Sequence, residues 1–320
     1  MKLSLAALCA GCIIDLLAGD PHSIPHPVEL IGKLISFLER NLRKLLPKNP
    51  GGERAAGLIL WLVTAGLSFA LPFFILRLCT RLHPLAGFAA ESIMCWQILA
   101  ARSLRDESMK VYEALTGGSI SDARRAVSMI VGRDTAELDD RAVARAAVET
   151  IAENSSDGVT APLLFLAIGG APLGFFYKAV NTMDSMLGYT EEPYKNIGFF
   201  PAKMDDIVNY IPSRLTGIFM LAAGFLMGLD VKNGCRIFHR DRRKHASPNS
   251  AQTEAACAGL LGIRLAGDAF YHGRLHKKEF IGDALREIEY SDIPLSCRLM
   301  FVTAFIAFAV FAGIKLIFII

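Results

Sequence analysis

Carboxylates and amides gather in the polar stretch from Arg133 to Pro162, which leads directly into an apolar segment. Near its end, the sequence ETIAENSSDG brings together four groups that could take part in catalysis: Glu149, Glu153, Asn154 and Asp157. Ionisable groups are costly beside a membrane, so a chain that keeps several there is expected to use them. A carboxylate pair at such a boundary, next to a flexible turn, could hold Mg²⁺ or an ammonium group. We take these four residues as candidate catalytic residues.

A solvated ladder of ion pairs is the alternative for the same stretch. Asp134, with Glu137 three residues on, has the spacing of a capping box and predicts a helix over Arg133–Asn154. Every fourth residue of that helix lies on one stripe, which here holds Arg141, Arg145, Glu149 and Glu153. Ion pairs at this spacing are common on exposed helices, where each is worth about 0.2–0.5 kcal/mol. The sequence leaves both interpretations open.

Three aspartates follow farther along the chain, in NTMDSM and AKMDDIV. Asp184 lies three residues after Asn181, whereas Asp205 and Asp206 are adjacent and would point about 100° apart on a helix. One of the pair could face a cavity while the other faces water or Lys203. Oxygen ligands of this kind suit Mg²⁺, which binds phosphates through one or two carboxylates. We take the three aspartates as candidate magnesium ligands, with helix capping and surface solvation as the alternative.

The proline-rich stretch GDPHSIPHPVELIG (Gly19–Gly32) carries two histidines, His22 and His26. Because proline fixes φ and removes backbone donors, we expect a rigid loop here and not a helix. Without cysteine partners these histidines make a poor zinc site. Hydrogen bonding to an anionic or amide-rich substrate is the better interpretation.

A second polar turn contains Ser247 and Asn249 and precedes a predicted helix start with a glycine-rich end. Both residues are candidates for substrate binding, and the basic side chains that flank the segment could receive phosphate: Lys244, His245 and Arg264. The sequence contains no GxxxxGK[ST], GxGxxG, HExxH or GxSxG pattern, so no P-loop binds ATP here. The residues alone indicate a membrane enzyme with an acidic metal–phosphate site.

The elements that must position these residues are mainly apolar helices. Hydrophobic residues make up 52% of the chain and its mean hydropathy is +0.38, too high for an ordinary soluble domain. Candidate membrane spans are Leu3–Ala18, Ala55–Cys79, Gly87–Ala101, Val159–Val180, Ile211–Leu229 and Leu299–Ile320. No β-hairpin signal or internal repeat stands out. We predict a mainly α, polytopic integral membrane protein with about four to six apolar segments.

Two of the apolar segments are doubtful as simple spans. Gly87–Ala101 is short and contains Glu91, and Val159–Val180 is interrupted by Gly169-Gly170-Ala171-Pro172. Such an interruption favours a re-entrant element, because irregular backbone is tolerated at membrane depth where it lines a cavity. The first segment lacks a convincing cleavage site and is expected to be a retained helix and not a signal peptide.

Basic residues populate the hydrophilic segments 20–54, 102–157 and 230–298. By the positive-inside tendency, these segments form helical loops in the cytoplasm. We expect a multi-pass protein of the cell membrane whose active site faces the cytoplasm. Residues 1–320 would form a single membrane-embedded domain.

Six blocks of the sequence resemble the adenosylcobinamide-phosphate synthase family of cobalamin biosynthesis (the CbiB type). They occur in the family's order: DLLAGDPHSIPHPVELIG, VGRDTAELDD, AAVETIAENSSDGVTAPLLF, YKAVNTMDSMLGY, AKMDDIVNYIPSRL and SPNSAQTEAACAGLLGIRLAG. Together these blocks are highly specific, although each alone would be weak. They span the chain from its first helix to about Gly273, and the apolar carboxyl end carries little of the resemblance.

The resemblance implies an amide ligation in cobalamin biosynthesis. The free propionate of adenosylcobyric acid would be joined to an amino-alcohol phosphate, usually (R)-1-amino-2-propanol O-phosphate, to give adenosylcobinamide phosphate. ATP would be a cosubstrate that activates the carboxylate, with Mg²⁺ offsetting charge, and the corrinoid would be a substrate and not a cofactor. The expected partners are these substrates, the lipid bilayer and other membrane enzymes of cobalamin biosynthesis, but no nucleic acid.

The resemblance does not itself assign roles to individual residues. On this interpretation, Glu149 or Glu153 would position or deprotonate the amine, and Asp184, Asp205 and Asp206 would hold Mg²⁺. Basic side chains would hold the phosphates: Arg133, Lys203 and Arg214. The remaining candidates for substrate binding are Asp134 and Asn181, with the histidines and the Ser247–Asn249 turn.

Two other classes of protein remain as alternatives. A membrane alcohol-phosphate transferase also uses aspartates near spans, and Asp157-Gly158-Val159-Thr160-Ala161 looks like part of such a motif. However, Asn154 replaces the upstream aspartate, and the downstream aspartate pair is absent at the required spacing. A corrinoid transporter without enzymatic activity would predict inverted repeats, which the sequence lacks.

Overall fold

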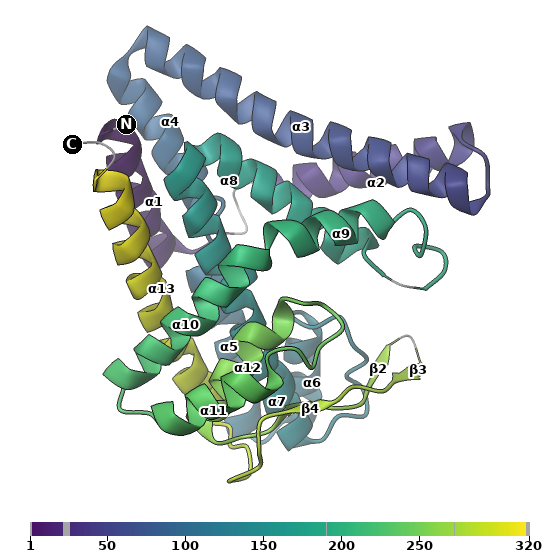
Figure 1. Cartoon of the computed structure of the whole chain (residues 1–320), viewed down its shortest axis with the longest axis vertical. Helices are drawn as coiled ribbons and strands as arrows, with labels where there is room; N and C mark the ends of the chain where they lie inside the picture. The colour runs from purple at the N-terminus through teal and green to yellow at the C-terminus, as the bar shows by residue number, and fades with distance from the viewer. Residues whose placement is uncertain (1, 22–25, 190, 272, 318–320) are drawn as a thin grey trace. The chain divides into compact units, whose positions relative to one another are not determined.

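The computed structural model describes residues 2–21, 26–189, 191–271 and 273–317. Helices form most of this part of the chain (Figure 1), which confirms the prediction of a mainly α fold. The chain divides into two compact units. Unit 1 comprises residues 1–100, 161–209 and 311–320, and unit 2 comprises residues 101–160 and 210–310.

Unit 1 is built mainly from apolar helices. Its helices are α1 (Lys2–Ala18), α2 (Pro27–Leu45), α3 (Pro50–Leu82), α4 (Pro84–Trp96), α8 (Ala161–Leu187) and α9 (Phe199–Val208), with the last turns of α13 (Asp292–Ile317). Of these, α2 is amphipathic and α9 is short. Helix α1 packs on α4, and α3 packs on α4 and α8. The polar ends of α8 and α9 therefore lie on an apolar scaffold.

Three helices of unit 1 begin with a proline, whose missing N–H is harmless at the first helical position. The residue before each proline, which is His26, Asn49 or His83, caps the helix by accepting a backbone N–H with its side chain. The expectation of a loop throughout GDPHSIPHPVELIG is therefore wrong from Pro27 onward, because that proline starts α2 and does not prevent it.

Unit 2 packs shorter helices around α12. Its helices are α5 (Ala101–Thr116), α6 (Ile120–Ser128), α7 (Asp140–Asn154), the π-helix η1 (Ser155–Thr160), α10 (Tyr210–Leu226), α11 (Val231–Asp241), α12 (Ser250–Leu261) and most of α13. Every residue of α12 from Ala251 to Leu261 is buried, and the helix contacts α7, α10 and α11. As predicted, α12 follows the Ser-Pro-Asn turn, and Gly262 ends it in the left-handed conformation. Polar side chains on α12 are thereby held in the core of the unit.

Unit 2 also contains short strands, so the expectation of no β-hairpin is wrong. Strands β2 (Ala269–Tyr271) and β3 (Arg274–His276) form an antiparallel hairpin, and β1 (Leu265–Ala266) pairs with β4 (Phe280–Ile281). Strands of two or three residues are too short to show the alternating pattern that predicts a strand.

The start of α7 corrects the predicted capping box. The helix begins at Asp140, and Asp139 caps it by accepting the N–H of Ala142 at 2.7 Å. Asp134 instead accepts the N–H of Gly273 at 2.7 Å, so it is tied to the β2–β3 hairpin. This contact, distant in sequence, holds the segment before Asp139 out of the helix, which a local spacing rule could not anticipate.

Four helical stretches of the described chain are long and apolar enough to cross a membrane: Pro50–Leu82, Pro84–Thr116, Asp140–Leu187 and Asp292–Ile317. Three of them have only 22 to 33% of their apolar window buried, so much of their surface is free to face lipid. In the stretch that contains α7 and α8, 67% of the apolar window is buried. The protein is a polytopic membrane protein with transmembrane helices.

Two of the four stretches contain the clearest apolar segments of the sequence, Ala55–Cys79 and most of Leu299–Ile320. The doubted segments Gly87–Ala101 and Val159–Val180 belong to the other two, because the helical region extends beyond the apolar part. Leu3–Ala18 and Tyr210–Leu226 are shorter apolar helices. The helices continue into polar residues on either side of these apolar segments, so hydropathy alone underestimates their length.

Helix α8 is interrupted where the sequence predicted a break. Gly169 has φ −128° and ψ 15°, and Gly170 has φ 64° and ψ −162°, which is far from helical geometry. Only glycine adopts the second conformation readily. The break divides α8 into an arm next to η1 and an arm that carries Asn181 and Asp184.

Gly57 offers a test of the packing in unit 1. A Cβ at this position of α3 would lie 2.1 Å from the carbonyl oxygen of Ile197, so Gly57→Ala forces α3 away from that segment. We expect a loss of about 1–3 kcal/mol, the range for overpacking, seen as a lower thermal midpoint of the detergent-solubilised protein. Gly66→Ala on the same helix is the control, because its Cβ would meet nothing within 4 Å. An equal midpoint for both variants would contradict this packing.

Candidate active site

Glu149 on α7 is held in a buried ion pair in unit 2. Its side chain accepts hydrogen bonds from the Arg133 guanidinium and from the N–H of Ala266, the latter at 2.7 Å, and the residue is only 8% exposed. Burial alone would lower the pKa of Arg133, but the charge of Glu149 raises it above its usual value. Arg133 and Glu149, both predicted from the sequence, therefore lie together as a charged pair.

The solvated ladder that the spacing of α7 permitted is wrong. Arg141 forms an ion pair at 3.1 Å with Glu287, a residue distant in sequence. The buried Nε of Arg145 has no hydrogen-bond partner in the described structure. Glu149 bonds to groups outside its own helix, because α7 is covered by the rest of unit 2 instead of by water.

Glu153 lies one turn after Glu149 and faces α12. The Ser250 hydroxyl donates a hydrogen bond to Glu153 Oε1 at 2.8 Å. Ser250 is the first residue of α12, so the Ser-Pro-Asn turn places this donor. Of the two predicted carboxylates of α7, Glu153 therefore faces α12, whereas Glu149 bonds to Arg133 and to the backbone of Ala266.

Glu254, one turn after Ser250, adds a third carboxyl group that the sequence did not single out. It is 5% exposed, and its Oε2 has no hydrogen-bond partner in the described structure. Burial, then the charges of Glu153 and Glu149, raise the pKa of Glu254 well above its ordinary value of 4.5. We call Glu149, Glu153 and Glu254 the carboxylate cluster, in which Glu254 is the carboxyl group that retains its proton.

His245 and Lys278 complete the electrostatic surroundings of the carboxylate cluster. Burial lowers the pKa of His245, although the charge of Glu153 opposes this, so the imidazole is neutral at pH 7. The charge of Lys278 lowers the pKa of both His245 and Glu254. A carboxyl group that holds its proton, a neutral imidazole and two further carboxyl groups are thus near one another, and general acid–base catalysis uses groups of these kinds.

Glu254→Gln tests the protonation of the carboxylate cluster. Because the folded protein retains the Glu254 proton and the unfolded chain loses it above pH 4.5, this residue makes the wild type less stable as pH rises from 4.5 towards the raised pKa. A single proton gives a slope of at most about 1.4 kcal/mol per pH unit. Glutamine cannot ionise, so the thermal midpoint of the variant should fall less between pH 5 and 8. Parallel pH dependences would show that Glu254 is ionised in the folded protein.

A second polar group of unit 2 contains Arg214 and Asn249, both predicted from the sequence. Arg214 Nη1 donates to Asn249 Oδ1 at 3.0 Å, and the guanidinium stacks 3.5 Å from the ring centroid of Tyr210. The Ser213 hydroxyl donates to the same Asn249 oxygen at 3.2 Å, and Ser247 Oγ accepts from the N–H of Asn249 at 3.2 Å. Arg214, Ser247 and Asn249 therefore lie together, and Ser250 follows directly in the chain.

Unit 1 holds the candidate aspartates. Asp205 is 8% exposed, and its Oδ1 accepts from Asn209 Nδ2 at 3.0 Å and from Asn181 Nδ2 at 3.5 Å. Its neighbour Asp206 instead pairs with Lys203 at 3.5 Å. The two adjacent aspartates point apart as predicted, and Asp206 faces Lys203, while Asp205 is buried against two amide side chains.

The carboxylate oxygens of these aspartates are ligands that suit magnesium, but the described side chains do not form a complete set of metal ligands. Within the described residues, no group of three or more His, Cys, Asp and Glu side chains is arranged to hold a metal ion. Asp205 with its amide partners offers hard oxygen donors, and Asp184 lies on α8 one turn after Asn181. Mg²⁺ commonly takes only one or two protein carboxylates and completes its shell with water and phosphate.

The remaining predicted residues have more local roles. His26 caps α2 and lies 3.7 Å from Asp20; burial lowers its pKa although Asp20 opposes the shift. Asn154 donates to the carbonyl of Thr150 in its own helix, and Asp157 lies on the π-helical turn η1. His22 lies outside the described residues.

Sequence reasoning missed Glu254, Lys278, Tyr177 and Asn209. Tyr177 donates to Asn209 Oδ1 at 2.9 Å, and so supports the amide that holds Asp205. A signal for Glu254 was present, because it follows Ser250 at helical spacing in a segment of alanine, cysteine and glycine. A helix composed of such small residues on all sides is expected to be buried, and an acid in it is exceptional.

Comparison with known proteins places the chain in a family. The chain matches the CobD/Cbib protein family over residues 8–300. It is 45% identical over 300 residues to the cobalamin biosynthesis protein CobD of Clostridium perfringens, with 94% of each chain covered. It is 47% identical to the protein of the same name from Geobacter metallireducens, with 92% of each chain covered.

A relative that carries the name CbiB has a similar sequence identity to the chain. The cobalamin biosynthesis protein CbiB of Salmonella choleraesuis is 42% identical over 313 residues, with 98% of each chain covered. No solved structure matches the chain. The matched range includes the carboxylate cluster, the Arg214–Asn249 group and the candidate aspartates, and the chain belongs to the CobD/CbiB family of cobalamin biosynthesis proteins.

Proposed function

We propose that this protein is an adenosylcobinamide-phosphate synthase. It would join the free propionate of adenosylcobyric acid to an amino-alcohol phosphate, with (R)-1-amino-2-propanol O-phosphate as the expected amine. The observation that carries this proposal is the carboxylate cluster in a chain of the CobD/CbiB family. An amine is protonated at neutral pH and becomes a nucleophile only when a base removes its proton, and buried carboxylates can do this.

Glu153 is the best placed base. Its Oε1 already accepts a hydrogen bond from Ser250, so an ammonium donor could take the place of that hydroxyl. Glu149 is engaged by Arg133 and Ala266, which suits a residue that fixes the site and supplies negative charge. Glu254 keeps its proton and could donate it to the departing oxygen.

The substrate carboxylate must be activated before the amine can attack. Transfer of the terminal phosphoryl group of ATP to a carboxylate oxygen would give an acyl phosphate and ADP. Attack by the amine nitrogen, whose ammonium proton Glu153 has accepted, would then form the amide bond and release phosphate. Glu254 would protonate the departing oxygen and regain a proton from the nitrogen. Mg²⁺ would offset the phosphate charge during this sequence, and Asp184, Asp205 and Asp206 are the residues proposed to hold it.

Arg214, Ser247 and Asn249 are proposed to bind a substrate phosphate. The Arg214 guanidinium and the Ser213 hydroxyl both donate to Asn249 Oδ1, so an incoming phosphate oxygen could replace that single acceptor. Lys203, beside Asp206, is a second candidate for phosphate binding. We further propose that the protein lies in the cell membrane with these groups accessible from the cytoplasm, since the basic segments favour that side.

Complementation tests the proposed function. The chain is expressed in a bacterium that lacks its own CobD/CbiB protein, and corrinoids are extracted and identified by mass spectrometry. We expect adenosylcobinamide phosphate to reappear and the pool of adenosylcobyric acid to fall. Persistence of the acid in cells that hold the folded chain in their membranes would overturn the proposal.

A further inference from the structure

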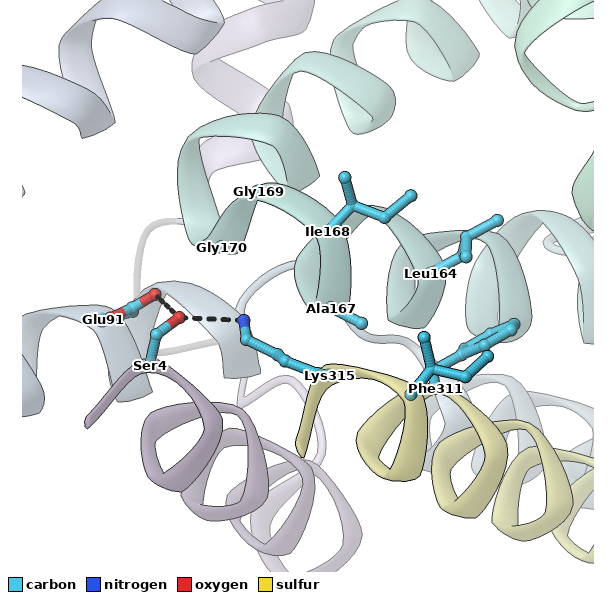
Figure 2. Close-up of a pocket in the computed structure, with 10 residues that line it drawn as sticks. Ser4, Glu91, Leu164, Ala167, Ile168, Gly169, Gly170, Phe311 and Lys315 are labelled. Carbon is cyan, nitrogen blue, oxygen red and sulfur yellow. Dashed lines mark hydrogen bonds between the residues drawn. The ribbon is translucent and has the colours of Figure 1, made fainter. Parts of the chain in front are cut away.

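Unit 1 contains a cavity that the proposed reaction does not use. Its volume is about 580 Å³, and its walls come from α1, α4, the middle of α8 and the end of α13. Figure 2 shows Ser4, Glu91 and Lys315 on one side, with the Gly169–Gly170 break of α8 beside them. The volume lies within the range of ligand-binding pockets.

Two hydrogen bonds link three polar side chains of this cavity. Lys315 Nζ donates to Ser4 Oγ at 3.1 Å, and the Ser4 hydroxyl donates to Glu91 Oε1 at 2.7 Å (Figure 2). Glu91 and Lys315 belong to stretches apolar enough to span a membrane. Placing two opposite charges there is costly, and apolar residues of similar size would pack at lower cost. The pair is therefore better explained by a ligand than by helix packing.

The break in α8 is a second, independent sign of a site. A Cβ on Gly170 would come within 2.6 Å of Glu91 Oε1, so the carboxylate occupies space that only glycine leaves open. Gly170 also has φ 64°, which frees the backbone from the helical hydrogen-bond pattern. Interrupted helices inside membrane proteins are tolerated where they line a cavity, and they commonly mark binding sites.

The opposite wall of the cavity is apolar. It is formed by Leu164 and Ile168 of α8 and by Phe311 and Ile314 of α13. A small, fully hydrophilic ligand would leave these side chains against water. A ligand that matches both walls must carry a polar group and a hydrocarbon part.

We propose that this cavity binds a membrane lipid whose headgroup carries both a phosphate and an ammonium group. The phosphate would lie on Lys315 and the ammonium on Glu91, with Ser4 between them, and an acyl chain would lie along Leu164, Ile168 and Phe311. A purely anionic headgroup would meet Glu91 as a like charge, and a purely cationic one would meet Lys315 in the same way. Only the zwitterion pairs with both charges.

Lipid binding to purified variants tests this proposal. Native mass spectrometry of the full-length protein in detergent would follow the addition of phosphatidylethanolamine, phosphatidylglycerol or free phosphoethanolamine. We expect phosphatidylethanolamine to bind the wild type, and to bind Lys315→Met and Glu91→Gln at least about tenfold more weakly, since each variant loses a charge-assisted hydrogen bond. Lys315→Arg should retain binding, which separates lost charge from misfolding. Lys232→Met, at an exposed position of α11, is the matched control.

The three ligands distinguish binding of a membrane lipid from binding of the free headgroup compound. Binding of both phosphatidylethanolamine and free phosphoethanolamine would support recognition of the zwitterion, and binding of the lipid alone would add a contribution from the apolar wall. Equal retention of phosphatidylglycerol, or unchanged binding in both charge variants, would overturn the proposal. Free phosphoethanolamine is itself an amino-alcohol phosphate, so only the part of its binding that Glu91→Gln and Lys315→Met weaken is assigned to this cavity. Binding of phosphatidylethanolamine is measured without corrinoid or ATP and does not depend on the proposed ligase reaction.

Discussion

Replacing Glu153 by glutamine is expected to lower the rate of adenosylcobinamide phosphate formation by about 10²- to 10⁴-fold, the usual contribution of a general base. Glutamine can still accept the hydrogen bond that Ser250 donates, so the packing of α7 on α12 should persist. The loss should appear in kcat, with little change in KM for ATP. Initial rates of the purified variant, measured by mass spectrometry of the product, provide the test.

Glu137→Gln is the matched control for this substitution. Glu137 is exposed and lies before the start of α7. Its variant should react at the wild-type rate. If Glu153→Gln retained that rate as well, the base would have to be another residue, and the role proposed for Glu153 would be wrong.

Replacing Asp205 by asparagine is the second change expected to have a large effect. Asp205 is buried between Asn181 and Asn209, and its carboxylate is the candidate magnesium ligand with the least exposure to water. We expect turnover to fall by at least about 10²-fold, in line with the several kcal/mol that a catalytic metal ion contributes. The Mg²⁺ concentration for half-maximal activity should also rise.

The magnesium dependence separates metal binding from a structural role. Asp184→Asn should shift the same dependence, whereas Asp122→Asn, at an exposed position of α6, should leave it unchanged. Wild-type activity in both Asp184→Asn and Asp205→Asn would rule out these aspartates as metal ligands. Lost activity with an unaltered magnesium dependence would instead assign Asp205 to the packing of unit 1.

The sequence predicted the helical class and many of the groups that lie together, because these depend on local composition. The apolar segments, the break at Gly169–Gly170 and the inward turn of Asp205 all follow from periodicity and glycine content within a short window. The residues of the Arg214–Asn249 group were chosen separately from the sequence, and the fold brings them into contact.

The predictions that proved wrong concern residues whose conformation depends on a contact with a residue distant in sequence. Asp134 has capping-box spacing, yet it bonds to Gly273 of the hairpin connection. Glu149 fits an ion-pair ladder on its own helix, yet its partners are Arg133 and the backbone of Ala266. Spacing in a helix describes which residues share a face, but it does not show what covers that face.

The proposed ligation is tested most directly by mass spectrometry of a reaction with the purified, folded, full-length protein. The reaction contains adenosylcobyric acid, aminopropanol phosphate, ATP and Mg²⁺, and each component is omitted in turn. We predict that adenosylcobinamide phosphate forms only when all four are present, with one ADP released per amide bond. Product formed without ATP, or no product from the folded protein with all four components, would contradict an ATP-dependent ligase.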